Sequence, residues 1–326
     1  MRAVVVPEPG RIEVEERPDP QPGPGEVVVR VHGAGLNRAD LLQRAGLYPA
    51  PPGVPADIPG LELAGEVVAQ GEGVSEPAIG ARVFGIVGGG GQAELAVIPA
   101  SSCAPVPADL DLVAAGGIPE VFVTAHDAMR TRADLLPGEH VLVHAVGSGV
   151  GTAVVQLAKA WNCTVTGTAR TEDKLTRAAA LGLDHGVLVT RDMEPDAIAD
   201  AVQRAGGPPG VVIDLVGGPY VVADLLAAAP GGRIVVVGTL AGGTAAVPLL
   251  ALMSKRLAMH GTVLRARSVE EKAAATAAFT REVVPLLDGR TVQPVIDAVL
   301  PLADAAAAYD RLASDATFGK IILDAR

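Results

Sequence analysis

The clearest chemistry in this sequence lies in a glycine-rich turn between a strand pattern and a helix pattern. The apolar run Val141–Val143 is typical of a strand buried on both faces, and apolar spacings of three and four from Val150 to Trp161 predict a helix. A helix N-terminus after such a turn presents backbone N–H groups to a phosphate, and glycine lets the phosphate come close. We therefore expect a dinucleotide to be bound by Val146, Gly147, Ser148, Gly149 and Val150.

The turn does not contain a complete G-x-G-x-x-G pattern. In the register that ends at Gly151, Val146 and Ser148 stand at the first two glycine positions, so a plain strand-to-helix turn stays open as the alternative. The sequence that follows favours the dinucleotide, because about five further apolar strands alternate with helices, as a doubly wound sheet requires.

The end of the second of these strands bears on the choice between NADH and NADPH. An acidic residue there would bind the ribose 2′-hydroxyl of NADH, but this chain has Ala169, which does not repel a 2′-phosphate. Arg170 and Lys174 supply positive charge for that phosphate, although Glu172 and Asp173 lie between them. The alternative is that Arg170 and Lys174 are only the solvated start of a helix.

The elements that position these residues divide the chain into two kinds of pattern. Residues 1–118 contain short β-type runs separated by Pro and Gly turns, which predicts an antiparallel β domain followed by connecting helix over Leu110–His126 and Thr124–Leu135.

From Glu139 a parallel sheet is expected, with strands at Val141–His144, Thr164–Thr168, Gly186–Val189, Val211–Asp214, Arg233–Val237 and Met259–Val263. The intervening helices are expected at Gly151–Trp161, Lys174–Leu181, Pro195–Ala205, Tyr220–Ala229 and Leu249–Arg256. The remaining tail, with helices Val269–Leu287 and Ala303–Ser314 and strands near Val295–Val299 and Lys320–Leu323, is expected to return to the first domain.

Composition excludes several classes of function. A net charge of −11 argues against a nucleic-acid partner, and no apolar run is long enough to span a bilayer. The two cysteines, Cys103 and Cys163, form neither a disulfide framework nor a zinc cluster. The sequence shows no signal peptide at Met1, so a cytoplasmic protein without a membrane partner is expected.

Several segments, in order along nearly the whole chain, resemble the medium-chain dehydrogenase/reductase superfamily. They are similar to its zinc-independent quinone oxidoreductase branch, and most of all to the tumour-suppressor-induced NADPH:quinone oxidoreductase subgroup. The segments are Leu36–Gly53, Pro59–Gly65, Gly88–Glu94, Ile118–Ala125, His144–Gln156 and Phe318–Leu323. The resemblance implies an α/β protein in which a GroES-like β domain (1–120) carries an inserted Rossmann doubly wound parallel-sheet domain (121–268) and a C-terminal return (269–326). It also implies NADPH as cofactor and a homodimer formed through the edge strand Met259–Val263.

The resemblance also bears on zinc, which the alcohol dehydrogenases of the superfamily use. Where those relatives carry a ligand cysteine this chain has Asn37, and where they carry a histidine beside a glutamate it has Leu61 before Glu62. We therefore expect no metal, and alcohol oxidation, which needs a Lewis acid to stabilise an alkoxide, is disfavoured.

A quinone needs less assistance, since its carbonyl readily accepts hydride. Asn37 and Tyr48 match the family's catalytic and cofactor-contacting positions, and Tyr48 would line the substrate site and donate its hydroxyl. The alternatives are that Asn37 is a turn residue and that Tyr48 is an aromatic plug before Pro49. Asp40 is expected to cap a helix over Leu41–Arg44.

Other cofactor-binding positions follow from topology and from the resemblance. Ligands bind beyond the carboxyl ends of parallel strands, which points to Gly238 with Thr239 after the fifth strand and to Leu264 and Arg265 after the sixth. Thr124 and Lys174 match family positions near the cofactor, whereas Val189 stands where relatives often have a tyrosine. Each of these could instead be an ordinary loop or surface residue.

Three functions are compatible with these features. The leading hypothesis is an NADPH-dependent quinone oxidoreductase that transfers hydride to a quinone or a related conjugated carbonyl. The alternatives are an enoyl or enone reductase of the same superfamily, and an NADPH-binding protein without catalysis. The scarcity of aromatic residues, 2% of the chain, predicts a substrate pocket lined by aliphatic side chains.

Overall fold

The computed structural model describes all residues, Met1–Arg326, and the chain forms two compact units. The first unit comprises Met1–Val123 and Leu264–Arg326, and the second comprises Thr124–Val263. The C-terminal segment belongs to the first unit because β15 (Lys320–Asp324) pairs antiparallel with β3 (Glu26–Gly35). None of the helices combines the length and the apolar character that a membrane span requires.

The first unit is built on a seven-stranded sheet in the order β14-β15-β3-β4-β5-β7, with β6 also paired to β3. The pairs among its strands within residues 1–118 are antiparallel, as predicted for that stretch, and at one edge β14 of the C-terminal return runs parallel to β15. Parallel pairing arises because α11 connects these two strands. The other strands are β1 (Arg2–Val5), β2 (Glu13–Glu16), β4 (Glu62–Gln70), β5 (Arg82–Ile86), β6 (Leu95–Pro99), β7 (Cys103–Pro105) and β14 (Ile296–Pro301).

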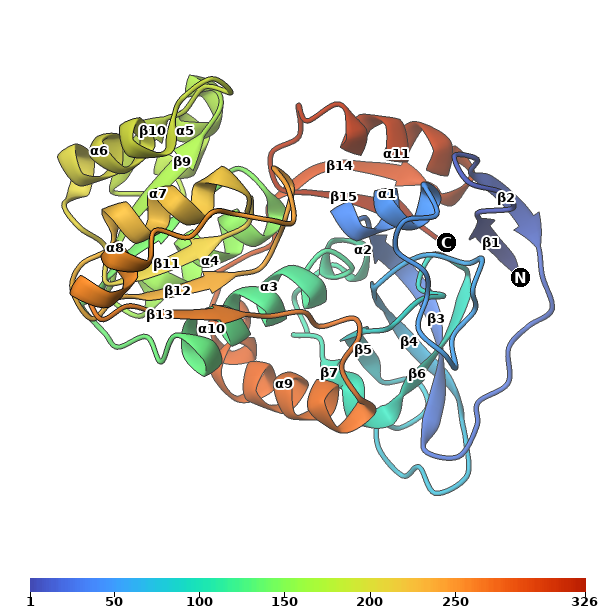
Figure 1. The fold of residues 1–326 in the computed structure, drawn as a ribbon. Coiled ribbons are helices and arrows are strands. Elements are labelled where there is room, and N and C mark those ends of the chain that lie inside the picture. Colours follow the sequence, from blue (N-terminus) through green and yellow to red (C-terminus); the bar gives the residue numbers. More distant parts are fainter. The chain divides into compact units, whose positions relative to one another are not determined.

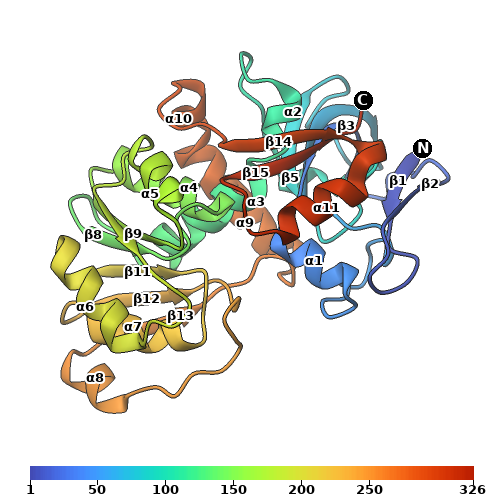
Figure 2. The same ribbon diagram turned by 90° about the horizontal axis from the view of Figure 1, so that it is seen from above.

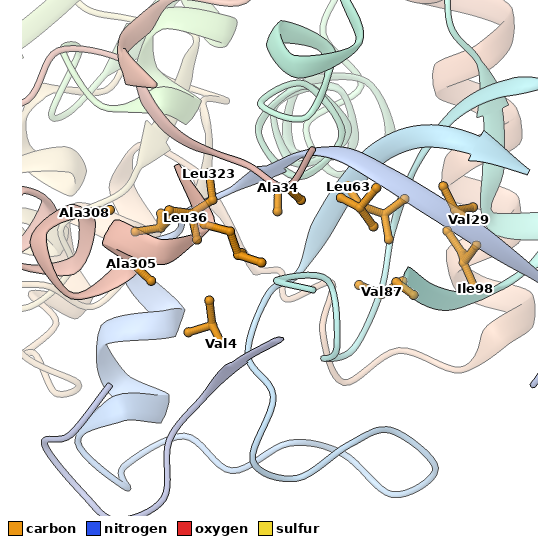
Figure 3. Close-up of a cluster of buried hydrophobic side chains, with 14 of the residues drawn as sticks. Val4, Val29, Ala34, Leu36, Leu63, Val87, Ile98, Ala305, Ala308 and Leu323 are labelled. Atoms are coloured by element: carbon orange, nitrogen blue, oxygen red, sulfur yellow. The ribbon is translucent and has the colours of Figure 1, made fainter. Parts of the chain in front are cut away.

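The core of the first unit joins both ends of the chain. Figure 3 shows Val29 of β3, Leu63 of β4, Leu323 of β15 and Ala305 of α11 in one cluster of buried side chains. The helices of this unit are α1 (Arg38–Arg44), α2 (Leu112–Ala115), α9 (Val269–Glu282), α10 (Val284–Asp288) and α11 (Ala305–Ala313), together with most of α3 (Pro119–His126). This shared core holds α1, β4 and β15 in fixed positions, which matters for the polar residues described below.

Two predicted helices are interrupted in the structure. Pro285 lies at the start of α10, and the expected helix Val269–Leu287 divides there because proline cannot donate the backbone hydrogen bond of a continuing helix. The expected helix Leu110–His126 is likewise divided between α2 and α3 around Gly116 and Gly117, and Pro119 begins α3. After α3 the expected helix Thr124–Leu135 continues only as a π-helical segment, Asp127–Arg132.

The second unit is a six-stranded parallel sheet in the order β10-β9-β8-β11-β12-β13, with its helices packed against it (Figures 1 and 2). This confirms the doubly wound α/β prediction, and β13 lies at the edge as expected. Its strands are β8 (His140–Val143), β9 (Thr164–Ala169), β10 (His185–Leu188), β11 (Val211–Asp214), β12 (Arg233–Val236) and β13 (Ala258–Gly261). Its helices are α4 (Gly149–Ala160), α5 (Glu172–Ala179), α6 (Pro195–Gly206), α7 (Pro219–Ala227) and α8 (Leu249–Ser254).

Candidate functional site

The glycine turn connects β8 to α4 and is shaped by two backbone requirements. Ala145 has a φ of 52°, and the Val146 N–H donates to the Thr168 carbonyl of β9 at 2.9 Å. A Cβ on Gly151 would lie 2.6 Å from the Ala145 carbonyl oxygen and 2.7 Å from that of Val146, so only glycine fits where α4 passes over the turn. The glycine that ends the turn is therefore needed for packing between helix and strand.

Ser148 caps α4 and leaves donors at the helix start. Its hydroxyl oxygen accepts the Gly151 N–H at 3.1 Å. The amides of Gly149 and Val150 precede the hydrogen-bond ladder of the helix and have no acceptor within it. Together with the positive end of the helix dipole, these amides suit an anionic group such as a pyrophosphate.

The residues predicted to contact a 2′-phosphate lie between β9 and α5. Ala169 is buried at the end of β9, Arg170 is exposed, and the Thr171 hydroxyl accepts the Lys174 N–H at 3.4 Å. The helix therefore begins at Glu172, two residues before the expected start, because Thr171 caps it. This places half-buried Lys174 in the first turn of α5, close in sequence to Arg170.

Tyr220, at the start of α7, lies near Arg170 and was not singled out from the sequence. Burial raises the pKa of Tyr220, and the positive charge of Arg170 acts against that rise. The Tyr220 ring also packs edge-on against the imidazole of His144, with the ring centres 4.8 Å apart. Tyr220 therefore provides an aromatic ring near Arg170. Val189, which stands where relatives often have a tyrosine, provides none.

His144, directly before the glycine turn, is fully buried and connects three elements. Its Nδ1 lies 2.9 Å from the Thr168 hydroxyl of β9, and its Nε2 lies 2.7 Å from Oδ1 of Asp224 on α7. Burial raises the pKa of Asp224 against the opposing effect of His144. This network fixes the strand ends that flank the turn, and no periodicity in the sequence indicated it.

In the first unit, Asn37 is the N-terminal cap of α1 and part of a buried polar cluster. Its N–H donates to Oδ2 of Asp40 at 2.8 Å, so Asp40 helps to cap the helix as expected, although the helix begins at Arg38 rather than Leu41. The Asn37 side-chain amide donates to Oε1 of Glu62 at 2.9 Å and to the Gly35 carbonyl at 3.3 Å. Both N–H groups of this side chain are therefore occupied.

Lys320 occupies the position between Asn37 and Glu62. Its ammonium lies 2.7 Å from Asn37 Oδ1, 2.7 Å from Glu62 Oε1, and also donates to the Leu36 carbonyl. Glu62 is fully buried and Lys320 is 4% exposed, so the pair is desolvated and depends on these contacts. No group of His, Cys, Asp and Glu side chains in the chain is arranged to hold a metal ion, and these residues do not fit a zinc site.

Glu120 joins this cluster from α3. Its backbone N–H donates to Oε2 of Glu62 at 2.8 Å. Burial, reinforced by the charge of Glu62 and opposed by Lys320, raises the pKa of the Glu120 carboxyl to about 8. Glu62, Glu120 and Lys320 all fall within the segments that carry the family resemblance, but nothing in their spacing indicated that they meet.

Tyr48 is half-buried and is held by Arg265. The Arg265 guanidinium lies 4.8 Å from the centre of the Tyr48 ring and donates to the Tyr48 carbonyl at 3.0 Å. Arg265 also donates to the Gly88 carbonyl at 2.9 Å and to Gln43 Oε1 at 2.5 Å, so its guanidinium is largely occupied by the protein. The Tyr48 hydroxyl makes no hydrogen bond within the protein.

The remaining predicted positions are dispersed between the two units. Gly238 follows β12, and a Cβ there would lie 2.5 Å from the Leu215 carbonyl oxygen, so glycine allows two loops at the carboxyl ends of β11 and β12 to approach. Thr124 on α3 and Leu264 are both buried. The structure therefore groups Val146–Val150, Arg170, Lys174 and Gly238 in the second unit, and Asn37, Tyr48, Leu264 and Arg265 in the first.

Two sequence families match the chain, and each match lies mostly within one of the two units. They are described as alcohol dehydrogenase GroES-like domain, which matches residues 23–108, and zinc-binding dehydrogenase, which matches residues 149–280. Among individual relatives, quinone oxidoreductase-like protein 2 of Bos taurus is 32% identical over 99% of this chain and 92% of its own length. The pikromycin polyketide synthase component PikAII of Streptomyces venezuelae is 39% identical over 225 residues, 67% of this chain but only 6% of that protein.

A solved structure shows the same architecture at similar identity. The quinone oxidoreductase of Thermus thermophilus, whose structure was determined alone and with NADPH, is 33% identical, with a TM-score of 0.81 over 99% of this chain and 100% of that one. These likenesses confirm the predicted GroES-like and Rossmann folds. They also support a nicotinamide cofactor and a small-molecule substrate.

Proposed function

We propose that this chain, which belongs to the medium-chain dehydrogenase/reductase superfamily and is an NAD(P)-dependent oxidoreductase, reduces quinones with NADPH and without zinc. The observation that carries the proposal is the Lys320 ammonium between Asn37 and Glu62. A cation that belongs to the chain itself holds these two side chains together, so the arrangement offers no Lewis acid to a substrate. A quinone needs none, because the anion formed by hydride addition is stabilised by its aromatic ring.

The proposal assigns different tasks to Asn37 and Tyr48. The two N–H groups of the Asn37 side chain are used by Glu62 and Gly35, so Asn37 positions the cluster and has no further hydrogen to donate. The Tyr48 hydroxyl has no partner in the protein, and it donates to the substrate carbonyl oxygen as negative charge develops there. Arg265 keeps the Tyr48 ring in place.

The preference for NADPH rests on charge near the end of β9. Ala169 places no carboxylate there, while Arg170 and Lys174 bring two positive charges and Tyr220 lies beside Arg170. Bound NADPH supplies the hydride. The backbone amides at the start of α4 hold its pyrophosphate.

The test is NADPH oxidation with an ortho-quinone, a para-quinone and an enone, with NADH run in parallel and with a metal chelator as control. We expect quinone turnover with NADPH at a rate that the chelator does not lower. Tyr48→Phe should lower kcat by about 10²-fold. Equal use of NADH would contradict the phosphate argument but leave the reaction class intact. Tight NADPH binding without turnover of any acceptor would instead favour a protein that binds NADPH without catalysis.

A second candidate is an enoyl or enone reductase. The relatives are not all quinone oxidoreductases, since the polyketide synthase component shares more identity with this chain, over a shorter stretch, than the quinone oxidoreductase-like protein does. Hydride addition to a conjugated carbon–carbon bond would use the same cofactor and the same Tyr48 donor. Turnover of the enone without turnover of either quinone would establish this candidate in place of the first.

The edge strand β13 supports a further part of the proposal, the homodimer. Residues 259–261 of β13 are exposed, and one side of the strand has no partner within the sheet. Pairing of this edge with its copy across a two-fold axis would cover it. Sedimentation equilibrium distinguishes a dimer from a monomer directly.

A further inference from the structure

Arg265, which follows β13 where the chain returns to the first unit, carries a buried positive charge that is paired with no carboxylate. The residue is 5% exposed, and its guanidinium donates to the backbone carbonyls of Gly88 and Tyr48 and to the side-chain oxygen of Gln43. All three acceptors are neutral. Burial of a charge among neutral acceptors is costly, and it leaves a positive potential that these contacts do not cancel.

Tyr48 is the side chain on which this charge acts most directly. The guanidinium lies 4.8 Å from the centre of the Tyr48 ring and also donates to the Tyr48 carbonyl at 3.0 Å, so the ring and the charge are fixed relative to each other. A positive charge at this distance favours negative charge on the phenol oxygen, which makes the free hydroxyl a stronger hydrogen-bond donor. The pKa of Tyr48 agrees with this, since burial raises it, Arg265 lowers it, and Glu120 of α3 raises it to a smaller extent.

A second arginine–tyrosine contact in the same unit shows what is particular to this one. The Arg44 guanidinium lies 5.6 Å from the centre of the Tyr309 ring, but it is paired with Asp310 at 3.3 Å. The Tyr309 hydroxyl is buried and donates to the side chain of Gln92 at 2.8 Å. At Tyr309 the protein itself satisfies both the charge and the hydroxyl, whereas at Tyr48 it satisfies neither.

We propose that Arg265 is a positioning residue that acts through Tyr48, an inference that rests on the function proposed above. Its charge strengthens the hydrogen bond from the Tyr48 hydroxyl to the anion that hydride transfer creates. Addition of hydride to the quinone leaves NADP⁺ and a hydroquinone monoanion, whose negative oxygen accepts this hydrogen bond. No bond of Tyr48 or Arg265 breaks, and a proton from water completes the hydroquinone, so each turnover consumes one quinone, one NADPH and one proton.

The kinetic test is a double-mutant cycle between Arg265 and Tyr48, at saturating NADPH and with one quinone that the wild type reduces. Arg265→Met should lower kcat by about 10-fold or more and change the KM for the quinone less, because the anion exists only after hydride transfer has begun. In the Tyr48→Phe background the same substitution should change kcat by less than about twofold, since the hydroxyl through which Arg265 acts is gone. An equal loss in both backgrounds would overturn the proposal.

Gln43→Glu separates the charge of Arg265 from its contacts and keeps the test decisive if Arg265→Met fails to fold. The new carboxylate replaces a side-chain oxygen 2.5 Å from the guanidinium, so it neutralises the charge while the contacts to Gly88 and Tyr48 remain. It gives up only the 3.3 Å hydrogen bond from Gln43 to the Ala56 carbonyl. We expect kcat to fall by about 10-fold while the midpoint of urea denaturation does not fall. An unchanged kcat would show that Arg265 serves the structure alone.

A measurement without turnover separates this inference from the proposed function. The chain has three tyrosines, so incorporated difluorotyrosine, whose hydroxyl ionises closer to neutral pH, gives a fluorine NMR titration in which Tyr48→Phe identifies one resonance. Ionisation at Tyr48 should move to higher pH in Arg265→Met and in Gln43→Glu, because the positive charge is removed or neutralised. It should stay in place in the matched control Arg44→Met, which should also leave kcat unchanged.

The two proposals fail in different ways. Ionisation at Tyr48 that does not move in Arg265→Met would overturn the role of Arg265, whether or not any quinone is reduced. If the ionisation moves as expected but the wild type reduces neither quinone nor enone, the effect of Arg265 on Tyr48 is upheld and the proposed function itself has failed.

Discussion

The glycine turn of the second unit and the Lys320 cluster of the first unit differ in what they leave unpaired. In the turn, the amides of Gly149 and Val150 are left without partners at the start of α4. In the cluster, the buried charges of Glu62 and Lys320 are paired with each other and with Asn37. The turn therefore offers unpaired backbone donors, while the cluster consists of buried side chains that satisfy one another.

The two regions also differ in how they tolerate substitution. A phosphate site made of backbone amides depends on the path of the chain, so it is sensitive to added atoms and insensitive to the loss of any one side-chain charge. A buried ion pair is the opposite, because removal of one partner leaves the other charge desolvated and uncompensated. The predictions below test this difference, beginning with the buried pair.

Lys320→Met should have the largest effect. It leaves Glu62 buried without its cation, and we expect the free energy of unfolding to fall by about 3–5 kcal/mol, measured by urea denaturation. Glu62→Gln in the same chain should recover part of this loss, because it removes the unpaired charge. The control is Lys159→Met in the second unit, whose partner Asp184 lies 2.9 Å away but whose side chain is 35% exposed. That variant should lose about 1 kcal/mol or less, and equal losses for the two lysines would contradict the contrast.

Gly151→Ala should have an intermediate effect. The added Cβ would meet the carbonyl oxygens of Ala145 and Val146 at 2.6 and 2.7 Å, so α4 has to shift relative to the turn. We expect a loss of about 1–3 kcal/mol in stability and a weakening of NADPH binding by about 10-fold or more, measured by calorimetry. Gly210→Ala is the matched control, because its Cβ would lie no closer than 3.5 Å to any neighbour. NADPH affinity that survives Gly151→Ala unchanged would show that the amides of α4 do not bind the cofactor.

The same contrast explains what could be predicted from the sequence. The strand β8, the turn and α4 are contiguous, so the periodicity around Val146–Gly151 was sufficient to predict them, with a helix start only two residues off. The cluster joins Asn37 to Lys320, 283 positions later in the chain, and such a contact follows from how β15 returns to β3 rather than from any local pattern. Tyr220 was missed for the same reason, since its proximity to Arg170 depends on the order of strands in the sheet.

Lys174→Met should have the smallest effect, because Lys174 acts through charge on a partly solvated phosphate. We expect NADPH binding to weaken by about 3–10-fold, or about 1 kcal/mol, with NADH binding unchanged, since NADH lacks the 2′-phosphate. The control is Arg177→Met, which removes the same charge one helical turn further along α5, where Arg177 lies 3.9 Å from Asp173. If Lys174→Met and Arg177→Met weaken NADPH and NADH equally, the lysine contributes only to the general charge of the helix. A loss confined to NADPH and to Lys174 would instead show that side-chain charge adds selectivity to a site whose affinity comes from the backbone.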